Sequence, residues 1–291
     1  MNPDPAPQAP APASPTPESA AERTPVNRFR LALRDGPAQL GLWLNLGDSV
    51  AAEICAGAGF DWLLIDMEHT AADLRTALRL LQTLAAYPVH PVVRIASGEP
   101  PLARMLLKQV LDLGATTVLV PMVDSAAQAA ELAAAVRYPA PRADAASPAV
   151  PPGVRGMAGA RASRWGRWRD QALRANDEVC LLVQAETVAA LDALEAIAAT
   201  DGVHGVFIGP ADLSASMGHP GNPGHPEVQA AIADAIARIV AGGKAAGILD
   251  TDPARAERWL ALGARFVAVG LDTAVLAQGT RAIADRYRIR S

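Results

Sequence analysis

The sequence predicts an α/β protein of the (β/α)8 TIM-barrel class, a single domain with eight parallel strands, and three observations support this. From about Gln39 onward, eight short apolar segments alternate with helical segments. The apolar segments lack polar alternation, which is typical of parallel strands covered on both faces. Eight such units in roughly 250 residues suit a closed barrel. An open doubly wound sheet has similar local patterning and stays an alternative, although no G-x-G-x-x-G motif follows the first strand.

The expected elements follow one another regularly along the chain. Strands are expected at 40–45, 61–66, 91–95, 116–122, 179–186, 205–209, 244–249 and 265–270. Helical patterns rich in alanine and leucine occupy 71–86, 101–114, 125–137, 188–199, 225–243 and 253–263, and glycine often closes them. In a barrel of this class, functional groups lie at the C-terminal ends of the strands or in the loops that follow.

Residues 1–27 are expected to form a disordered tail ahead of a barrel domain of residues 28–291. The first 25 residues contain eight prolines and too few apolar side chains for a core. They have neither the apolar centre of a secretory signal nor the arginine-rich pattern of a transit peptide. No uninterrupted apolar run in the chain is long enough to span a membrane.

The composition favours a small-molecule partner. A net charge of -4 and an aromatic content of 4% argue against a nucleic-acid groove or a membrane-surface helix, both of which need concentrated basic charge. The hydrophobic fraction of 51% is ample for a sizeable core. Cys55 and Cys180 lie far apart and fit no metal-ligand spacing, which indicates two reduced thiols in a cytoplasmic protein.

Charged side chains close the second and third expected strands. The segment WLLIDMEHT places Asp66, Glu68 and His69 straight after an apolar run, and unpaired charges are costly to bury. These side chains are therefore expected at the C-terminal end of the strand, where water, a metal or a substrate can reach them. Arg94 closes the third strand and needs an anionic partner. The structural alternatives are an ion pair of Arg94 with Asp66 or Glu68, and a capped loop position for His69.

Oxygen ligands close the fifth and sixth expected strands. Gln184 and Glu186 are two residues apart and so project from one face of a strand. Asp212 stands near the start of a helix, where free N–H groups attract anions. Two carboxylates and an amide match the preference of Mg²⁺ or Mn²⁺ for a few oxygen ligands. Taken singly, Asp212 also fits a helix cap, and Glu186 a solvated strand end.

The segments GFDWLLIDMEH, HPVVR, LLVQAET and GVFIGPADLSASMGHPGNPGHPEV give the sequence a resemblance to the HpcH/HpaI family of metal-dependent class II aldolases, from about Gln39 to about Ala284. The resemblance implies the barrel fold and a hexamer assembled as a dimer of trimers. It is strongest to members that cleave 4-hydroxy-2-oxoheptanedioate to pyruvate and succinate semialdehyde in aromatic catabolism. Related members act on 2-keto-3-deoxy sugar acids, so the resemblance implies the pyruvate half more firmly than the aldehyde.

The resemblance also implies a metal and substrate site. Glu186 and Asp212 would hold a divalent ion, Mg²⁺ or Mn²⁺, with Co²⁺ as a further option. Gln184 and the backbone at Ala211 and Asp212 would hold pyruvate. Zinc is less expected, because the sequence has no cysteine or paired-histidine ligand spacing.

The catalytic roles implied by the resemblance need no lysine. Arg94 would stabilise the enolate oxygen, and His69 would be the base. Asp112 matches the aspartate that supports this histidine across a subunit boundary. Lys108 and Lys244 are the only lysines, and neither stands at the end of an expected strand, which disfavours a Schiff-base aldolase.

Two other functions stay open. One is a lyase of the same superfamily that acts on an acyl-CoA or phosphoenolpyruvate-type substrate, although the sequence lacks a basic nucleotide-binding patch. The other is a barrel that binds a metal and a 2-keto acid without carbon–carbon chemistry. The segments at about 97–104 and 139–152 are longer than the family pattern, and Met67 stands where glycine or another residue is expected.

Overall fold

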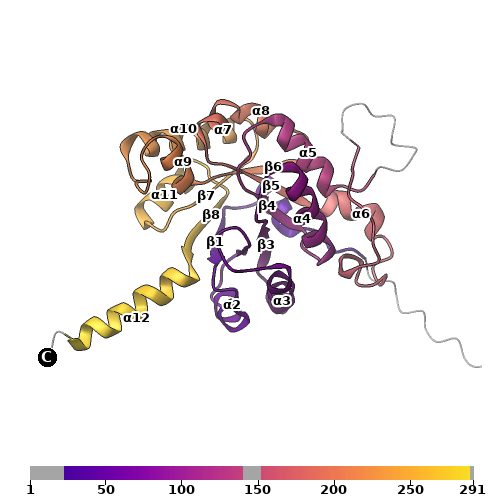
Figure 1. The fold of residues 1–291 in the computed structure, drawn as a ribbon, viewed down its shortest axis with the longest axis horizontal. Helices are drawn as coiled ribbons and strands as arrows, with labels where there is room; N and C mark the ends of the chain where they lie inside the picture. Colours follow the sequence, from indigo (N-terminus) through magenta and orange to yellow (C-terminus); the bar gives the residue numbers. More distant parts are fainter. Residues whose placement is uncertain (1–22, 140–151, 289–291) are drawn as a thin grey trace, which may run out of the picture.

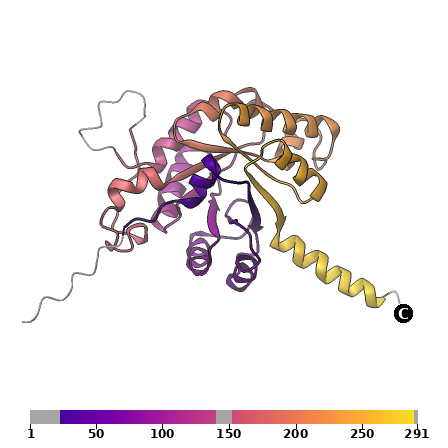
Figure 2. The same ribbon diagram turned by 180° about the vertical axis from the view of Figure 1, so that it is seen from behind.

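The computed structural model describes residues 23–139 and 152–288 and shows a closed barrel of parallel strands in chain order (Figures 1 and 2). The strands are β1 Gln39–Leu44, β2 Trp62–Asp66, β3 His90–Arg94, β4 Thr117–Val120, β5 Cys180–Ala185, β6 Val203–Ile208, β7 Ala245–Leu249 and β8 Phe266–Leu271. Gln39 of β1 pairs with Phe266 of β8 and closes the sheet. The barrel prediction is confirmed, and the open doubly wound alternative is wrong.

Helices alternate with the strands and cover the outside of the barrel (Figure 1). They are α1 Arg28–Asp35, α2 Ser49–Ala56, α3 Leu74–Leu84, α4 Pro100–Asp112, α5 Ala126–Val136, α6 Gln171–Glu178, α7 Val188–Asp192, α8 Leu194–Ala199, α9 Pro210–Ser216, α10 Pro226–Ala241, α11 Pro253–Ala261 and α12 Asp272–Arg288. All six expected helical patterns are present, and the pattern at 188–199 is divided into α7 and α8. The sequence prediction missed the short helices α1, α2 and α6, which have 8 residues each, and it missed α12.

Aromatic side chains fill the inside of the barrel below its C-terminal mouth. Trp43, Trp62 and Phe266 are almost fully buried there and pack against one another. Glycine makes room for them, because a Cβ at Gly41 would lie 2.2 Å from the Trp62 ring and one at Gly247 would lie 2.3 Å from the Phe266 ring. The interior is therefore a packed core, and only the mouth can hold a polar site.

The described end of the expected tail packs against the folded body. The backbone N–H and hydroxyl of Thr24 both donate to Asp170 Oδ1 at 2.8 Å. The backbone N–H of Asn27 donates to Glu178 Oε2 at 2.7 Å. Thr24 and Asn27 are buried, so these residues belong with the barrel and not with a tail that ends at 27. Residues 1–22 of the expected tail lie outside the described residues.

The two segments that exceed the family pattern differ in how much of them is described. Residues 97–104 form part of the loop after β3 and the first turn of α4, which begins at Pro100. Most of the second segment, residues 140–151, lies outside the described residues.

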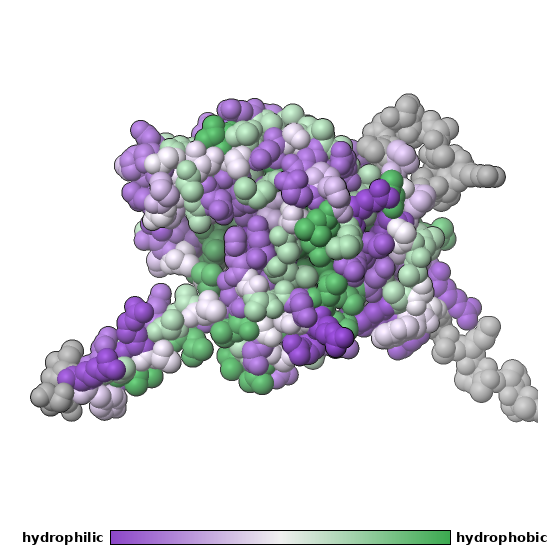
Figure 3. Space-filling model, viewed as in Figure 1, coloured by the Kyte–Doolittle hydropathy of each residue, from purple (hydrophilic) through white to green (hydrophobic). Residues whose placement is uncertain are grey.

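Helix α12 extends away from the barrel (Figures 1 and 2). Among its described residues, only Asp272 is buried. The helix exposes large apolar side chains along its length, namely Val275, Leu276, Ile283 and Tyr287. Figure 3 shows further hydrophobic surface over α2, where Val50 and Ile54 are 62% and 71% exposed. No described helix, α12 included, combines the length and apolar character needed to cross a membrane.

Candidate active site

Asp66 and Arg94 stand side by side at the mouth, at the ends of β2 and β3. Arg94 donates from Nε to Asp66 Oδ1 and from Nη2 to Oδ2, both at 2.8 Å, and its Nη1 lies 2.7 Å from Glu68 Oε2. The guanidinium also lies over the Trp43 ring, 5.3 Å from its centroid. Burial opposes the charge on Arg94, but the hydrogen bond and charge of Asp66 outweigh it and raise the pKa of Arg94. The ion pair weighed as a structural alternative is therefore present, at the mouth itself.

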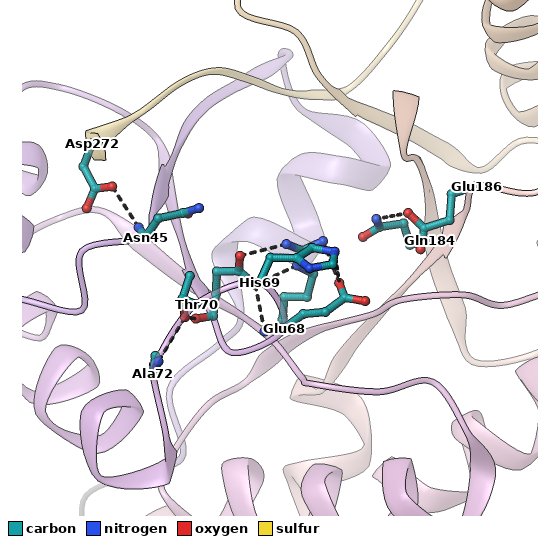
Figure 4. A network of polar contacts seen from close by, with 10 residues as sticks. Asn45, Glu68, His69, Thr70, Ala72, Gln184, Glu186 and Asp272 are labelled. Carbon is teal, nitrogen blue, oxygen red and sulfur yellow. Dashed lines mark hydrogen bonds and ion pairs between the residues drawn. The ribbon is translucent and has the colours of Figure 1, made fainter. Parts of the chain in front are cut away.

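Glu68 and His69 lie in the loop that follows β2 (Figure 4). Burial raises the pKa of Glu68 to about 7, and the neighbouring Asp66 and Asp212 charges also raise it, whereas Arg94 opposes the shift. The His69 ring lies with its Nε2 3.9 Å from Glu68 Oε2, and its side chain is 62% exposed. His69 is thus free to meet a substrate that enters the mouth.

Glu186 follows β5 and is almost fully buried. Its Oε1 accepts the backbone N–H of Met122 at 2.8 Å, and its Oε2 accepts a hydrogen bond from Gln184 Nε2. A Cβ at Gly209 would lie only 2.2 Å from Glu186 Oε2, so glycine is required at the end of β6 for this carboxylate to fit. Burial raises the pKa of Glu186 to about 7, and the charges of Asp212 and Glu68 add to the effect.

Asp212 lies in the first turn of α9, next to Ala211. Both residues are exposed, and no side chain caps this helix, so no capping side chain occupies its first N–H groups. Burial is the main cause of the raised pKa values of Glu186 and Glu68, and the charge of Asp212 adds to it. The sequence prediction placed Gln184, Glu186 and Asp212 at one mouth, and the structure brings them there.

The residues at this mouth fit a divalent cation. Glu68 is partly buried and Glu186 almost fully buried, beside the exposed Asp212. Burial, and then the charges of the neighbouring carboxylates, favours the protonated forms of Glu68 and Glu186 unless a cation balances them. The oxygen Oε1 of Gln184 is buried without a hydrogen-bond partner among the described residues. Carboxylate and amide oxygens are the ligands that Mg²⁺ and Mn²⁺ prefer. Glu186, Asp212 and Gln184 therefore form a suitable donor set.

Asp112 does not lie at the mouth of its own chain. It ends α4, where its Oδ1 accepts a hydrogen bond from Arg155 Nη2 at 3.1 Å. Arg155 is buried and lies over the Tyr138 ring, 4.4 Å from its centroid. A partnership between Asp112 and His69 would therefore need a second copy of the chain.

Sequence reasoning missed Met122, Asn45 and Asp272, which shape the mouth through backbone groups. Met122 has a φ of 54°, a left-handed conformation uncommon for non-glycine residues, and this residue presents its N–H to Glu186. Asp272 accepts the N–H of Asn45 at 2.8 Å (Figure 4). Residue type gives no signal for a backbone donor, and Asn45 and Asp272 lie at opposite ends of the barrel sequence.

His219 and His225 form part of the loop between α9 and α10. With Glu227 they present ligand atoms within 4.8 Å of one another. The two rings stack at a centroid distance of 3.6 Å, His219 Nε2 lies 2.8 Å from Glu227 Oε2, and His225 Nδ1 accepts the Glu227 N–H at 3.3 Å. These contacts close the loop and cap α10, which accounts for both histidines without a metal.

Comparison of the sequence with known families and proteins identifies close relatives. The family model described as HpcH/HpaI aldolase/citrate lyase matches residues 39–279. A hydroxypyruvate/pyruvate aldolase of Pseudomonas aeruginosa is 56% identical over 266 residues, which cover 91% of this chain and 94% of the relative. A 4-hydroxy-2-oxo-heptane-1,7-dioate aldolase of Salmonella newport is 52% identical over 265 residues, which cover 90% of this chain and 95% of the relative.

Solved structures show the same fold. An HpcH/HpaI aldolase/citrate lyase family protein from Burkholderia cenocepacia superposes with a TM-score of 0.83 and 40% identity, over 91% of this chain and 100% of the other. The CitE protein of Mycobacterium tuberculosis, solved with magnesium and pyruvate, superposes with a TM-score of 0.54 over 81% of this chain and 87% of the other. At 19% identity, this second likeness shows the fold alone.

Proposed function

This chain belongs to the HpcH/HpaI aldolase/citrate lyase family, and from its site we propose that it is a metal-dependent class II aldolase. It reversibly cleaves a 4-hydroxy-2-keto acid to pyruvate and an aldehyde. The convergence of Glu186, Asp212, Arg94 and His69 at one barrel mouth carries this proposal, because these groups supply a metal site, a cation for an enolate and a base. The names of the two relatives, which act on pyruvate and on a 4-hydroxy-2-oxo acid, support it.

Glu186 and Asp212 hold the divalent ion, which we propose to be Mg²⁺ or Mn²⁺. Gln184 and the backbone N–H groups of Ala211 and Asp212 hold the carboxylate and keto groups of the 2-keto acid. The bound ion supplies Lewis-acid polarisation of the keto oxygen. The buried Oε1 of Gln184 has no hydrogen-bond partner among the described residues. Because this atom is an acceptor, the bound ion or one of its waters would satisfy it, whereas the carboxylate and keto oxygens of the acid would not.

Arg94 and His69 carry the proton and charge movements of cleavage. His69 accepts the proton of the C4 hydroxyl, the C3–C4 bond breaks, and C4 leaves as the aldehyde carbonyl. The electron pair of that bond enters the enolate of pyruvate, whose oxygen Arg94 stabilises through its fixed guanidinium. A proton added at C3 then completes pyruvate, and the synthetic direction reverses each step.

Neither lysine of the chain takes part. Lys244 precedes β7, on the face opposite the mouth, and its Nζ donates to the carbonyl of Val203 at 2.7 Å. Lys108 lies on the exposed side of α4. A Schiff base with the 2-keto acid would need a lysine at the mouth, so the chemistry proceeds through the carboxylates, Arg94 and His69.

The aldehyde half is proposed to be succinate semialdehyde, released from 4-hydroxy-2-oxoheptanedioate. A 2-keto-3-deoxy sugar acid is the second candidate substrate, because the described mouth contains the neutral amide of Asn45 as well as charged groups. A barrel that binds the metal and the 2-keto acid without turnover is the non-catalytic alternative. The two thiols that the structure leaves outside any disulfide, Cys55 and Cys180, support a cytoplasmic location.

The exposed apolar side of α12 supports a homo-oligomer. A helix that leaves its own barrel with Val275, Leu276 and Ile283 exposed gains stability by packing on a second copy. We propose that this contact builds the hexamer and that Asp112 of one copy supports His69 of another.

A panel of aldehydes assayed with pyruvate, with and without a chelator, tests the function. We expect carbon–carbon bond formation that EDTA abolishes and that added Mg²⁺ or Mn²⁺ restores. Succinate semialdehyde and hydroxylated aldehydes separate the two candidate substrates. Binding of pyruvate and metal without turnover on any aldehyde would favour the non-catalytic barrel, and turnover that survives the chelator would overturn the metal assignment.

A further inference from the structure

Asn45 lies at the mouth, just beyond the end of β1. Side chains alternate along a strand, and Gly41 and Trp43 face the inside of the barrel, so Asn45 continues the inward-facing series. The same alternation on the neighbouring strand places Asp66 two residues beyond the interior residue Leu64. Asn45 thus stands at the level of the charged groups of the site, on a wall that the metal-binding residues do not occupy.

The backbone of Asn45 is fixed by hydrogen bonds, whereas one atom of its side chain lacks a hydrogen-bond partner within the described part of the chain. Asp272 is 7% exposed and accepts the N–H groups of Asn45 at 2.8 Å and Leu46 at 3.1 Å. The Oδ1 atom of Asn45 is buried and has no hydrogen-bond partner among the described residues. A buried polar atom without a partner costs roughly 1–3 kcal/mol. Because the backbone is fixed and Oδ1 is unpartnered in the described ranges, the Asn45 amide is available to hydrogen-bond with a ligand at the mouth.

The barrel geometry decides which part of a substrate reaches this amide. In the closed strand order, β1 lies across the mouth from β5, which carries Gln184 and leads to Glu186. Figure 4 shows Asn45 on one side, Gln184 and Glu186 on the other, and His69 with Glu68 between them. A 2-keto acid held at β5 and β6 therefore extends past His69 toward Asn45 with its far end. The aldehyde-derived half of the substrate meets the amide.

The charges at the mouth indicate the chemical class of that half. Arg94 is already matched by the carboxylates of Asp66 and Glu68, so it leaves little positive charge for a second carboxylate. The Asn45 amide is neutral and offers both N–H donors and a carbonyl acceptor. A hydroxyl group, which both donates and accepts, satisfies such an amide better than a methyl group does.

We propose that Asn45 is a specificity-determining residue that binds the hydroxyl group of an α-hydroxyaldehyde acceptor. This inference rests on the proposed aldolase function and, of its two candidate substrates, favours the 2-keto-3-deoxy sugar acid, whose cleavage releases an α-hydroxyaldehyde, over 4-hydroxy-2-oxoheptanedioate. It adds a contact on β1 to a site whose other groups come from β2, β3, β5 and β6. A bound hydroxyl group would supply the hydrogen-bond partner that Asn45 Oδ1 lacks among the described residues.

Glycolaldehyde and propanal, a matched pair that differs by a hydroxyl in place of a methyl group, test the proposal in the metal-loaded full-length protein. Asn45→Ala should lower kcat/KM for glycolaldehyde about tenfold relative to propanal, the loss typical of one hydrogen bond to a buried polar group. Leu46→Ala is the control, because Leu46 shares the Asp272 contact but its side chain is 42% exposed. This control should leave the glycolaldehyde-to-propanal ratio unchanged.

Three results would overturn the proposal: an equal loss on both aldehydes, no loss on either, or a loss confined to succinate semialdehyde. The last would show that Asn45 binds a carboxylate instead. Wild-type turnover of propanal with pyruvate tests the aldolase function separately. Absence of that turnover with every aldehyde would reject the aldolase function, whereas normal turnover with an unchanged aldehyde ratio in Asn45→Ala would reject only the role of Asn45.

Discussion

Asp66 and Arg94 form a two-point ion pair in which Nε and Nη2 of the guanidinium each donate at 2.8 Å to one carboxylate oxygen. The two residues are register partners on β2 and β3, so the sheet itself sets their spacing. The third guanidinium nitrogen, Nη1, lies 2.7 Å from Glu68. Such a planar, two-point contact fixes the orientation of the guanidinium. Arg94 is therefore held ready before any substrate arrives.

Asp66→Asn should lower both stability and activity, because it leaves Arg94 buried with one carboxylate fewer. Breaking a buried ion pair costs about 3–5 kcal/mol, and the remaining Glu68 contact favours the lower end of that range. Urea unfolding measures the first effect, and proton exchange at pyruvate C3 measures the second.

Asp250→Asn is the matched control for this substitution. Asp250 closes β7 and binds Arg255 through the same two-point geometry, with both contacts at 2.8 Å. It should lower stability while leaving pyruvate exchange close to the wild-type rate. Equal losses of exchange in both variants would show that Asp66 acts only by supporting the fold.

Glu186→Gln and Asp212→Asn should each remove metal-dependent activity while the fold is retained. Each substitution keeps the size of the side chain and removes one charged oxygen ligand from the proposed site. Calorimetric titration with Mn²⁺ should show the affinity falling at least tenfold, and circular dichroism should be unchanged. Glu227→Gln, on the surface of α10, is the control and should bind Mn²⁺ as the wild type does. Activity that persists in chelator-treated Glu186→Gln would refute the metal assignment.

The sequence predicted the parts of this molecule that depend on local pattern. Eight apolar strands and the polar groups at their ends were recognisable because a parallel barrel places all strand ends at one mouth. Met122 was missed because its contribution is an N–H group in a left-handed conformation. The hydrogen bond from the Asn45 N–H to Asp272 joins residues 227 positions apart, and no local sequence pattern reveals such a contact.

The direction of α12 was also beyond prediction from the sequence. The sequence prediction missed α12 itself, and whether a helix packs on its own barrel depends on tertiary contacts. The depth of Glu186 depends likewise on Gly209 of the next strand, where any larger side chain would collide with the carboxylate. Local composition thus predicted which groups gather at the mouth, whereas the packing of neighbouring strands decides how far each one is buried.

The stability of the protein should fall in mild acid because two histidines are largely withdrawn from solvent in the fold. Burial lowers the pKa of both His90 and His204 from 6.5 to about 4. The folded state then binds fewer protons than the unfolded state between these values, so stability is complete above pH 6.5 and is lost as the pH falls toward 4. For each histidine the loss is on the order of 3 kcal/mol.

A variant with both histidines replaced, His90→Gln with His204→Gln, isolates this effect. Glu68 and Glu186 have raised pKa values and act in the opposite direction, since their protonated forms favour the folded state at low pH. The difference between wild type and variant in urea unfolding, measured from pH 7 to pH 5, removes their contribution. The wild type should lose more stability than the variant over this range, and parallel pH curves would contradict the assignment.

Charges on the exposed side of α12 should dissociate the proposed assembly. Leu276→Glu and Ile283→Glu place carboxylates on side chains that are 54% and 59% exposed, so they cost the isolated fold little. Light scattering should report a smaller particle with unchanged circular dichroism. Gln278→Glu adds the same charge at an exposed polar position of the same helix and should leave the assembly intact. An unchanged mass in the Leu276→Glu variant would exclude this face of α12 from the interface.

His69→Ala should lower the rate of carbon–carbon bond cleavage more than the rate of enolate formation. The His69 side chain is 62% exposed and lies 3.9 Å from Glu68, whereas the proposed metal and pyruvate ligands come from β5 and α9. Removal of the imidazole should therefore leave pyruvate and metal binding intact. Cleavage should fall by roughly 10² to 10⁴, the usual loss when general acid–base catalysis is removed.

Proton exchange at pyruvate C3 distinguishes the possible roles of this histidine, because exchange needs the enolate but no aldehyde. If His69 acts on the C4 hydroxyl alone, cleavage should fall much further than exchange in His69→Ala. Arg94→Ala should lower both rates, since the enolate oxygen loses its cation in each reaction. Equal losses of cleavage and exchange in His69→Ala would mean that His69 also helps to form the enolate. Near-normal cleavage would reduce His69 to a loop residue at the end of β2.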